Sequence, residues 1–155
     1  MARIARSDAR LGSLLVALQV ALLAWLVVKG VAGLTVGRLT VDAVALAVAG
    51  MALGLWALSA NRPGNFNIRP VPRSGGELVQ HGPYRWIRHP MYSALLLVGL
   101  AAARLAGDVE SWLVLAVLVV VLVIKANVEE RGMIERHAGY RDYRERTRRF
   151  VPGLY

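Results

Sequence analysis

The segment VDAVALAVAGMALGLWALSA, residues Val41–Ala60, decides the fold class of this 155-residue chain. It carries one charged residue, Asp42, at its start, and a helix of this length rises about 30 Å, the thickness of a membrane's hydrocarbon core. A second apolar run, Leu11–Val28, is interrupted only by Gln19 and a few small residues. Both segments are predicted to be transmembrane helices, and a content of 56% hydrophobic residues excludes an ordinary soluble domain.

Two shorter apolar segments follow, Met91–Leu105 and Trp112–Ile124. As helices they barely span a membrane, and the short stretch Gly107–Ser111 between them predicts a tight helical hairpin. The alternative is a pair of buried or re-entrant helices. We expect an all-α, polytopic membrane protein with about four transmembrane helices, a cytoplasmic loop and a C-terminal amphipathic helix. It forms a single domain, with two membrane helices in residues 1–60 and the functional core in residues 61–155.

The basic residues lie between the apolar segments, and the net charge is +9. A nucleic-acid-binding protein would instead spread Lys and Arg over a folded polar face, so no nucleic-acid partner is expected. The positive-inside rule places the N-terminus, the loop Asn61–His89 and the tail from Lys125 in the cytoplasm. The same charges would attract the anionic head groups of membrane lipids.

The first apolar segment follows Arg3, Arg6 and Arg10 and could therefore be a signal peptide. Its length and the three apolar segments after it favour a retained membrane anchor instead. We expect a multi-pass protein of a bacterial or archaeal inner membrane.

The absence of cysteine excludes disulfides, thiolate metal sites and a cysteine nucleophile. The three histidines, His81, His89 and His137, are too far apart in sequence to form a metal-ligand motif, so no metal site is predicted. The other loops are minimal, so chemistry is expected in the two sizeable cytoplasmic pieces, Asn61–His89 and Glu129–Tyr155.

The His89-Pro90 step marks the start of the third apolar helix. Proline disfavours a helical conformation in the residue before it and suits the first position of a helix, so His89 is expected at the N-cap. The backbone N–H groups of residues 91–93 would then lack partners within the helix. With Arg88 beside them, they would form a site for a carboxylate or a phosphate.

The fourth helix is expected to continue past Ile124 toward Ile134. This continuation brings the adjacent carboxylates Glu129 and Glu130 to the inner edge of the membrane. One or both could bind hydroxyls or an ammonium group.

The tail carries Tyr140, Tyr143, Thr147 and Phe150 at spacings of three and four, with charged residues between them. This pattern indicates an amphipathic helix that ends at Pro152 and lies on the membrane surface or closes over the central loop.

In their order along the chain, these motifs resemble the isoprenylcysteine carboxyl methyltransferase family. That family belongs to a wider set of integral-membrane methyltransferases, which includes phospholipid N-methyltransferases. The resemblance implies a helical membrane protein that binds S-adenosylmethionine between the loop, the start of the penultimate membrane helix and the C-terminal helix. It is carried by Leu78-Val79, Gly82-Pro83-Tyr84, Arg88-His89-Pro90-Met91-Tyr92, Glu129-Glu130, and the tail residues Tyr140, Tyr143, Thr147, Arg149, Phe150 and Pro152.

Carried over by position, the cofactor contacts implied by the resemblance come from both cytoplasmic pieces. They fall on Gly76, Glu77, Leu78, Val79, Tyr84, His89, Pro90, Met91, Tyr92 and Glu130, with Glu129 as the neighbour in the glutamate pair. Methyl transfer from a sulfonium mainly requires alignment and the exclusion of water, so no catalytic triad is expected. The methyl acceptor is expected to be a lipophilic or small molecule, which Arg88 or Lys125 could orient. Tyr84 or Tyr92 could stack on adenine or face the sulfonium.

Two departures from the family pattern stand out. Ala126 occupies the position of an arginine that the family assigns to the prenylcysteine substrate, and the adjacent Lys125 projects about 100° away around the helix. Activity toward a prenylcysteine is therefore expected to be weak. Residues 137–139 replace a phenylalanine-glycine pair, which is expected to change only a turn between helices.

Taken singly, each of these motifs has an ordinary explanation, such as interfacial aromatic residues or a solvated face for the glutamate pair. Their joint occurrence favours a methyltransferase. Two alternatives stay open: a non-catalytic helical membrane protein that binds partners or lipids, and a membrane reductase that uses a nicotinamide in a similar fold. The sequence does not define the acceptor or the oligomeric state.

Overall fold

The computed structural model describes residues 2–61 and 77–154. The regular secondary structure of these residues is helical, apart from one isolated parallel β-bridge between Ile87 and Arg148. The elements in chain order are α1 (Ala2–Thr35), α2 (Val41–Ala60), the 3-10 helix η1 (Gly82–Arg85), α3 (Pro90–Ala106), α4 (Val109–Arg136) and α5 (Tyr140–Arg146). The prediction of an all-α protein is confirmed.

The described residues contain three helices long and apolar enough to cross a membrane, over Leu11–Thr35, Val41–Ala60 and Val109–Arg136. The helix α3 is shorter, with 17 residues. The helix α4 has 28 residues, so the expectation that the fourth apolar segment barely spans is wrong. Its extra length comes from both ends, because it starts before Trp112 and continues past Ile124 as predicted. The apolar helices make the chain a multi-pass membrane protein.

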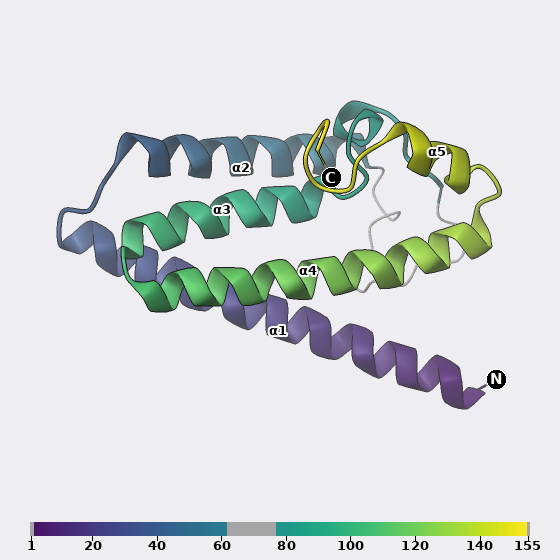
Figure 1. Ribbon diagram of the computed structural model, residues 1–155, viewed down its shortest axis with the longest axis horizontal. Coiled ribbons are helices and arrows are strands. Elements are labelled where there is room, and N and C mark those ends of the chain that lie inside the picture. Colours follow the sequence, from purple (N-terminus) through teal and green to yellow (C-terminus); the bar gives the residue numbers. More distant parts are fainter. Residues whose placement is uncertain (1, 62–76, 155) are drawn as a thin grey trace.

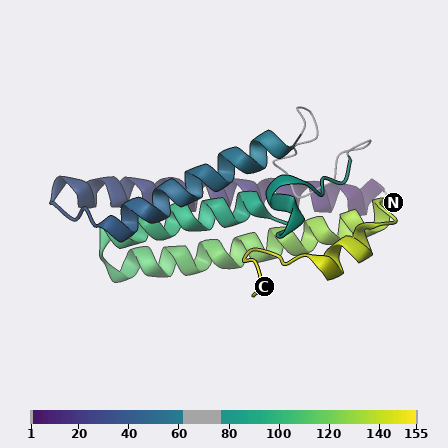
Figure 2. The ribbon, with the colours of Figure 1, turned by 90° about the horizontal axis from the view of Figure 1, so that it is seen from above.

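The short helix α3 occupies the centre of the bundle. It packs against α1, α2 and α4, and Figure 2 shows it between α2 and α4. Its residues on the contact faces are small, among them Ala94, Gly99 and Ala101–Ala103, all of which are buried. Small side chains allow neighbouring helix backbones to approach closely, which is how helices associate within a membrane.

Glycines on the neighbouring helices meet the faces of α3. A Cβ atom on Gly30 of α1 would lie 3.0 Å from the Cα of Ala102, and one on Gly33 would overlap the carbonyl oxygen of Leu105. Larger residues at these positions would force α1 away from α3. The close contact between α1 and α3 therefore depends on these glycines.

A tight turn joins α3 to α4, as predicted. Gly107 ends α3 in the left-handed conformation, with φ of 67°, and Asp108 caps α4. The Asp108 carboxylate accepts hydrogen bonds of 2.8 Å from both the N–H and the hydroxyl of Ser111. Lys29 of α1 lies 3.1 Å from the same carboxylate and holds the turn against α1.

The helices alternate in direction, which gathers the polar parts of the chain at one end of the bundle. Figure 1 shows the N-terminal end of α1, the C-terminal end of α2, η1 and α5 at the same end. The turns between α1 and α2 and between α3 and α4 lie at the other end. The central loop and the tail can therefore build one joint site.

The predicted amphipathic helix in the tail is only partly correct, because α5 ends at Arg146. Thr147 has an extended backbone, and the residues after it run beside the segment that precedes α3. The N–H of Arg148 donates to the carbonyl of Trp86 at 2.9 Å, and the N–H of Arg88 donates to the carbonyl of Arg148 at 2.8 Å. This pairing gives hydrogen-bond partners to backbone groups of both irregular segments. If α5 continued as a helix, the backbone groups of the segment before α3 would lose these partners.

Candidate active site

The start of α3 positions the first group of site residues. His89 is the N-cap residue, as predicted, with Pro90 at the first helical position. Its carbonyl accepts hydrogen bonds from the N–H groups of Tyr92, at 3.0 Å, and Ser93, at 3.1 Å. These two donors therefore have partners, contrary to the expectation of an open anion site formed by the first turn. Pro90 restricts the backbone of His89, whose side chain contacts Glu130 of α4.

The tail covers this helix start through main-chain and hydroxyl contacts. The N–H of His89 donates to the carbonyl of Arg149 at 3.1 Å, and the Ser93 hydroxyl donates to the carbonyl of Phe150 at 2.6 Å. Earlier in the tail, on α5, the Tyr143 hydroxyl donates to the carbonyl of Tyr84 at 2.8 Å. The tail is therefore fastened to both η1 and α3.

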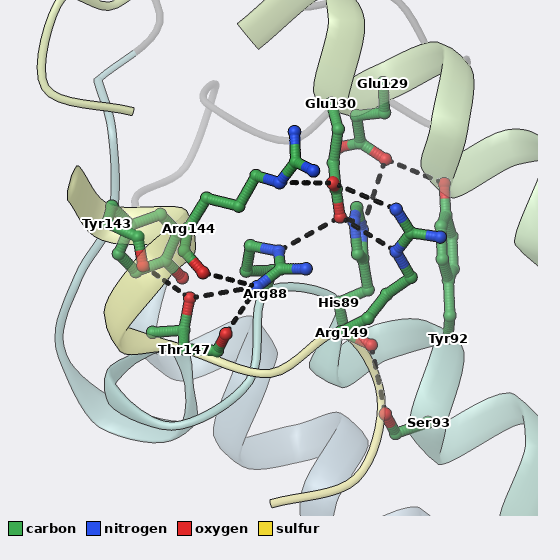
Figure 3. Close-up of polar contacts among 10 residues, drawn as sticks. All are labelled: Arg88, His89, Tyr92, Ser93, Glu129, Glu130, Tyr143, Arg144, Thr147 and Arg149. Atoms are coloured by element: carbon green, nitrogen blue, oxygen red, sulfur yellow. Dashed lines mark hydrogen bonds and ion pairs between the residues drawn. The ribbon is translucent and has the colours of Figure 1, made fainter. Parts of the chain in front are cut away.

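Glu130 of α4 lies at the centre of the cluster in Figure 3, and only 3% of its surface is exposed. Its Oε1 atom lies 3.0 Å from Nε of Arg88, 3.1 Å from Nε2 of His89 and 3.1 Å from Nε of Arg149. The Nη2 atom of Arg149 donates to Oε2 at 3.1 Å. A buried carboxylate is tolerated only when it is paired in this way. Glu130 therefore ties together α4, the helix start and the tail.

Arg88 uses its guanidinium to hold the tail. Besides Glu130, it donates from Nη1 to the carbonyl of Arg144 at 3.0 Å and to the carbonyl of Thr147. Figure 3 shows these contacts converging on the end of α5. These donors are directed at the protein itself, so orientation of an acceptor by Arg88 stays a prediction.

Glu129, the other member of the pair, has different surroundings. Its side chain is 34% exposed, and its Oε2 atom accepts a hydrogen bond of 2.9 Å from the Tyr92 hydroxyl. The Nδ1 atom of His89 lies 3.6 Å from the same oxygen. The His89 ring thus lies between the two glutamates, and it stacks parallel to the Tyr92 ring at 5.2 Å. Of the two carboxylates, Glu129 is the one that a ligand can reach.

Tyr84 closes another side of the site from η1. Burial, together with the charge of the nearby Glu129 carboxylate, raises the pKa of Tyr84 to about 12. Burial also raises the pKa values of Tyr140 and Tyr143 on α5. These phenols therefore stay protonated and neutral at physiological pH, so they offer hydroxyl groups and ring surfaces rather than charge.

The structure brings five of the predicted cofactor residues into one cluster: Tyr84, His89, Tyr92, Glu129 and Glu130. Pro90 is buried in the helix start and Met91 is half-buried beside it. Glu77 is exposed and Leu78 and Val79 are half-buried, and the contacts described above involve none of these three. Gly76 lies outside the described residues.

The sequence did not predict that Arg149 is a partner of Glu130. It also did not predict that Thr147 accepts a hydrogen bond from Arg88, or that Ser93 donates one to the carbonyl of Phe150. Arginines beside a membrane are usually contacts with lipid head groups, so the signal that separates Arg149 from the other tail arginines is its place among the residues that carry the family resemblance. In the described residues no group of three His, Asp or Glu side chains is arranged to hold a metal ion.

Fold and site together define an integral-membrane protein whose polar cluster lies at one end of a helical bundle. The family model described as the isoprenylcysteine carboxyl methyltransferase (ICMT) family matches residues 43–135, which include α3, nearly all of α2 and α4, His89 and both glutamates. The chain belongs to this family. Members are methyltransferases that use S-adenosylmethionine, and so this protein is a methyltransferase with the same cofactor. Neither the curated proteins nor the solved structures contain a match to the chain.

Proposed function

We propose that the protein transfers a methyl group from S-adenosylmethionine to a lipophilic acceptor at the cytoplasmic face of the membrane. The observation that carries this proposal is the contrast within the glutamate pair. Glu130 is enclosed by Arg88, His89 and Arg149, whereas Glu129 keeps a third of its side chain exposed. Glu130 therefore holds the surrounding side chains in place, and Glu129 is accessible to a ligand.

The residues present fit the cofactor's chemistry. The exposed carboxylate of Glu129 suits an ammonium group or the ribose hydroxyls, and the neutral ring of Tyr84 suits the adenine. A counter-charge for the cofactor's carboxylate is available from Arg144, which is half exposed and lies 4.0 Å from Glu130 at the edge of the cluster. Arg144 would bind the carboxylate in place of the N–H groups of Tyr92 and Ser93, because those two groups donate to the His89 carbonyl.

When bound, the cofactor supplies an electrophilic methyl group on a positive sulfur. The protein's part is to align this group with the nucleophile and to exclude water, which accounts for most of the rate of such a displacement. The tail serves this purpose, because it is fastened over the start of α3 by Ser93, Arg88 and the backbone of residues 148–149. The acceptor would enter from the lipid side, where the helices expose large apolar side chains.

A binding titration with detergent-purified protein tests the function. We expect S-adenosylmethionine and S-adenosylhomocysteine to bind and NADPH not to bind. Transfer of radiolabel from the methyl donor into extracted membrane lipids, a prenylcysteine analogue or small thiols, compared at equal concentration, then identifies the acceptor class. Binding of NADPH alone would favour a reductase, and binding of none of the three would favour a non-catalytic protein.

The cytoplasmic location can be tested separately by cysteine labelling, because the chain contains no cysteine. The exposed residue Gln80 lies in the segment before η1, and the exposed residue Glu110 lies at the opposite end of the bundle. We expect an impermeant thiol reagent added to intact cells to label Glu110→Cys, and to label Gln80→Cys only after the membrane is opened. Labelling of Gln80→Cys in intact cells would show that the site faces away from the cytosolic cofactor.

A further inference from the structure

Lys125 is a buried ammonium group within α4, with 1% of its surface exposed. It lies about 24 Å along the helix from Val109, directly after the apolar run that ends at Ile124. A charged side chain buried at this depth is costly, and such residues usually serve a function.

The partners of Lys125 come from two other helices. Its Nζ atom donates to the side-chain carbonyl of Gln19 on α1, and the same atom lies 5.1 Å from the centre of the Tyr92 ring on α3. The ion pairs found among residues 11–61 and 77–154 do not include Lys125. A neutral amide and an aromatic face therefore make these two contacts with the cation, and the charge of Glu129, about one turn further along α4, also acts on it. A cation–π contact is strongest where the cation is shielded from water, as Lys125 is.

Tyr92 connects this buried pair to the site. Its hydroxyl donates to Glu129 at 2.9 Å, and its ring lies parallel to that of His89. A continuous series of contacts thus runs from Gln19 through Lys125 and Tyr92 to Glu129. It begins on α1, a helix outside the segment that the family model matches.

We propose that Gln19 and Lys125 are positioning residues for Glu129, which they act on through Tyr92. The inference rests on the proposed function, in which Glu129 holds the cofactor. Lys125 takes the cation position on the Tyr92 ring, so this ring orients Glu129 rather than facing the sulfonium. The first membrane helix is then part of the catalytic unit, and its contact with α4 sets the affinity for the cofactor.

The test measures the affinity for S-adenosylhomocysteine by calorimetry, together with the thermal unfolding midpoint of each variant. We expect Lys125→Met to weaken binding about five- to tenfold and Gln19→Leu about threefold, while Lys125→Arg stays within about twofold because the cation is retained. The control is Val20→Leu, a lipid-exposed change on α1 beside Gln19, which should leave binding unchanged.

A double-mutant cycle separates positioning from simple helix packing. Once Tyr92→Phe has removed the hydroxyl that reaches Glu129, Lys125→Met should weaken binding no further. If Lys125→Met weakens binding equally in both backgrounds, or lowers only the unfolding midpoint, the positioning role is overturned.

Should Lys125→Met fail to fold, Gln19→Leu is measured in the wild-type and Tyr92→Phe backgrounds instead, and the same comparison supports or overturns the positioning role. Failure of the wild type to bind would instead overturn the proposed function and this inference with it. Unchanged affinity in both Tyr92→Phe and Glu129→Gln would refute the assignment of Glu129, separately from the role of Lys125.

Discussion

Replacement of Glu130 by glutamine is expected to destabilise the protein by about 3 kcal/mol and to abolish measurable cofactor binding. The carboxylate is 3% exposed and is the shared partner of Arg88, His89 and Arg149. Removing its charge takes the shared carboxylate from two half-buried guanidinium groups, and the tail loses its ion pair between Arg149 and α4. Intrinsic tryptophan fluorescence during heating measures the stability, since the chain has four tryptophans.

The matched control is Glu135→Gln, which removes an exposed carboxylate from the same helix. It should leave both stability and binding unchanged. The double variant Glu130→Gln with Arg149→Gln should recover part of the lost stability, because it also removes one of the cations that the carboxylate neutralises. A Glu130→Gln protein as stable as the wild type would contradict the role of Glu130 as the shared partner of the cluster.

The membrane helices could be predicted from the sequence because a lipid environment leaves an apolar run few alternatives to a helix. Val41–Ala60 was predicted with the bounds that α2 has in the structure. The start of α3 was predictable for a local reason as well, since Pro90 restricts the backbone of His89. Both predictions depend on a few neighbouring residues and on nothing distant.

The tail shows why the remainder could not be predicted. Tyr140, Tyr143, Thr147 and Phe150 have helical spacing, yet the helix ends at Arg146 because residues 148 and 149 pair with the segment before α3. That competition is decided by a contact between parts of the chain that lie some 60 residues apart, which a local pattern does not contain.

The same limit applies to the site. The sequence predicts Glu129 and Glu130 side by side at the end of α4, and the resemblance implies a cofactor contact at Glu130, with Glu129 only as its neighbour. Only the three-dimensional arrangement separates them, because the partners of Glu130 come from the helix start and the tail, while Glu129 meets Tyr92. The contact between Lys125 and Gln19 joins residues 106 positions apart, so it could not be predicted from the local spacing of residues either.

Because Glu129 and Glu130 have different surroundings, we expect a different result for Glu129→Gln, a large loss of cofactor affinity without a loss of stability. Its side chain is a third exposed, so the substitution should leave the unfolding midpoint within a few degrees of the wild type. Loss of a charge-assisted hydrogen bond to the cofactor's ammonium or hydroxyls should weaken S-adenosylhomocysteine binding about tenfold to a hundredfold. Calorimetric titration of the purified variant measures the affinity directly.

Comparison with its neighbour makes the Glu129 result decisive. In Glu130→Gln, loss of binding and loss of stability should appear together, whereas in Glu129→Gln only the binding should fall. Tyr92→Phe should show a smaller version of the Glu129 effect, because it removes one hydrogen bond to that carboxylate and keeps the ring. If Glu129→Gln binds S-adenosylhomocysteine as tightly as the Glu135→Gln control, the exposed carboxylate is not a cofactor contact, and the cofactor's ammonium group must be held elsewhere in the cluster.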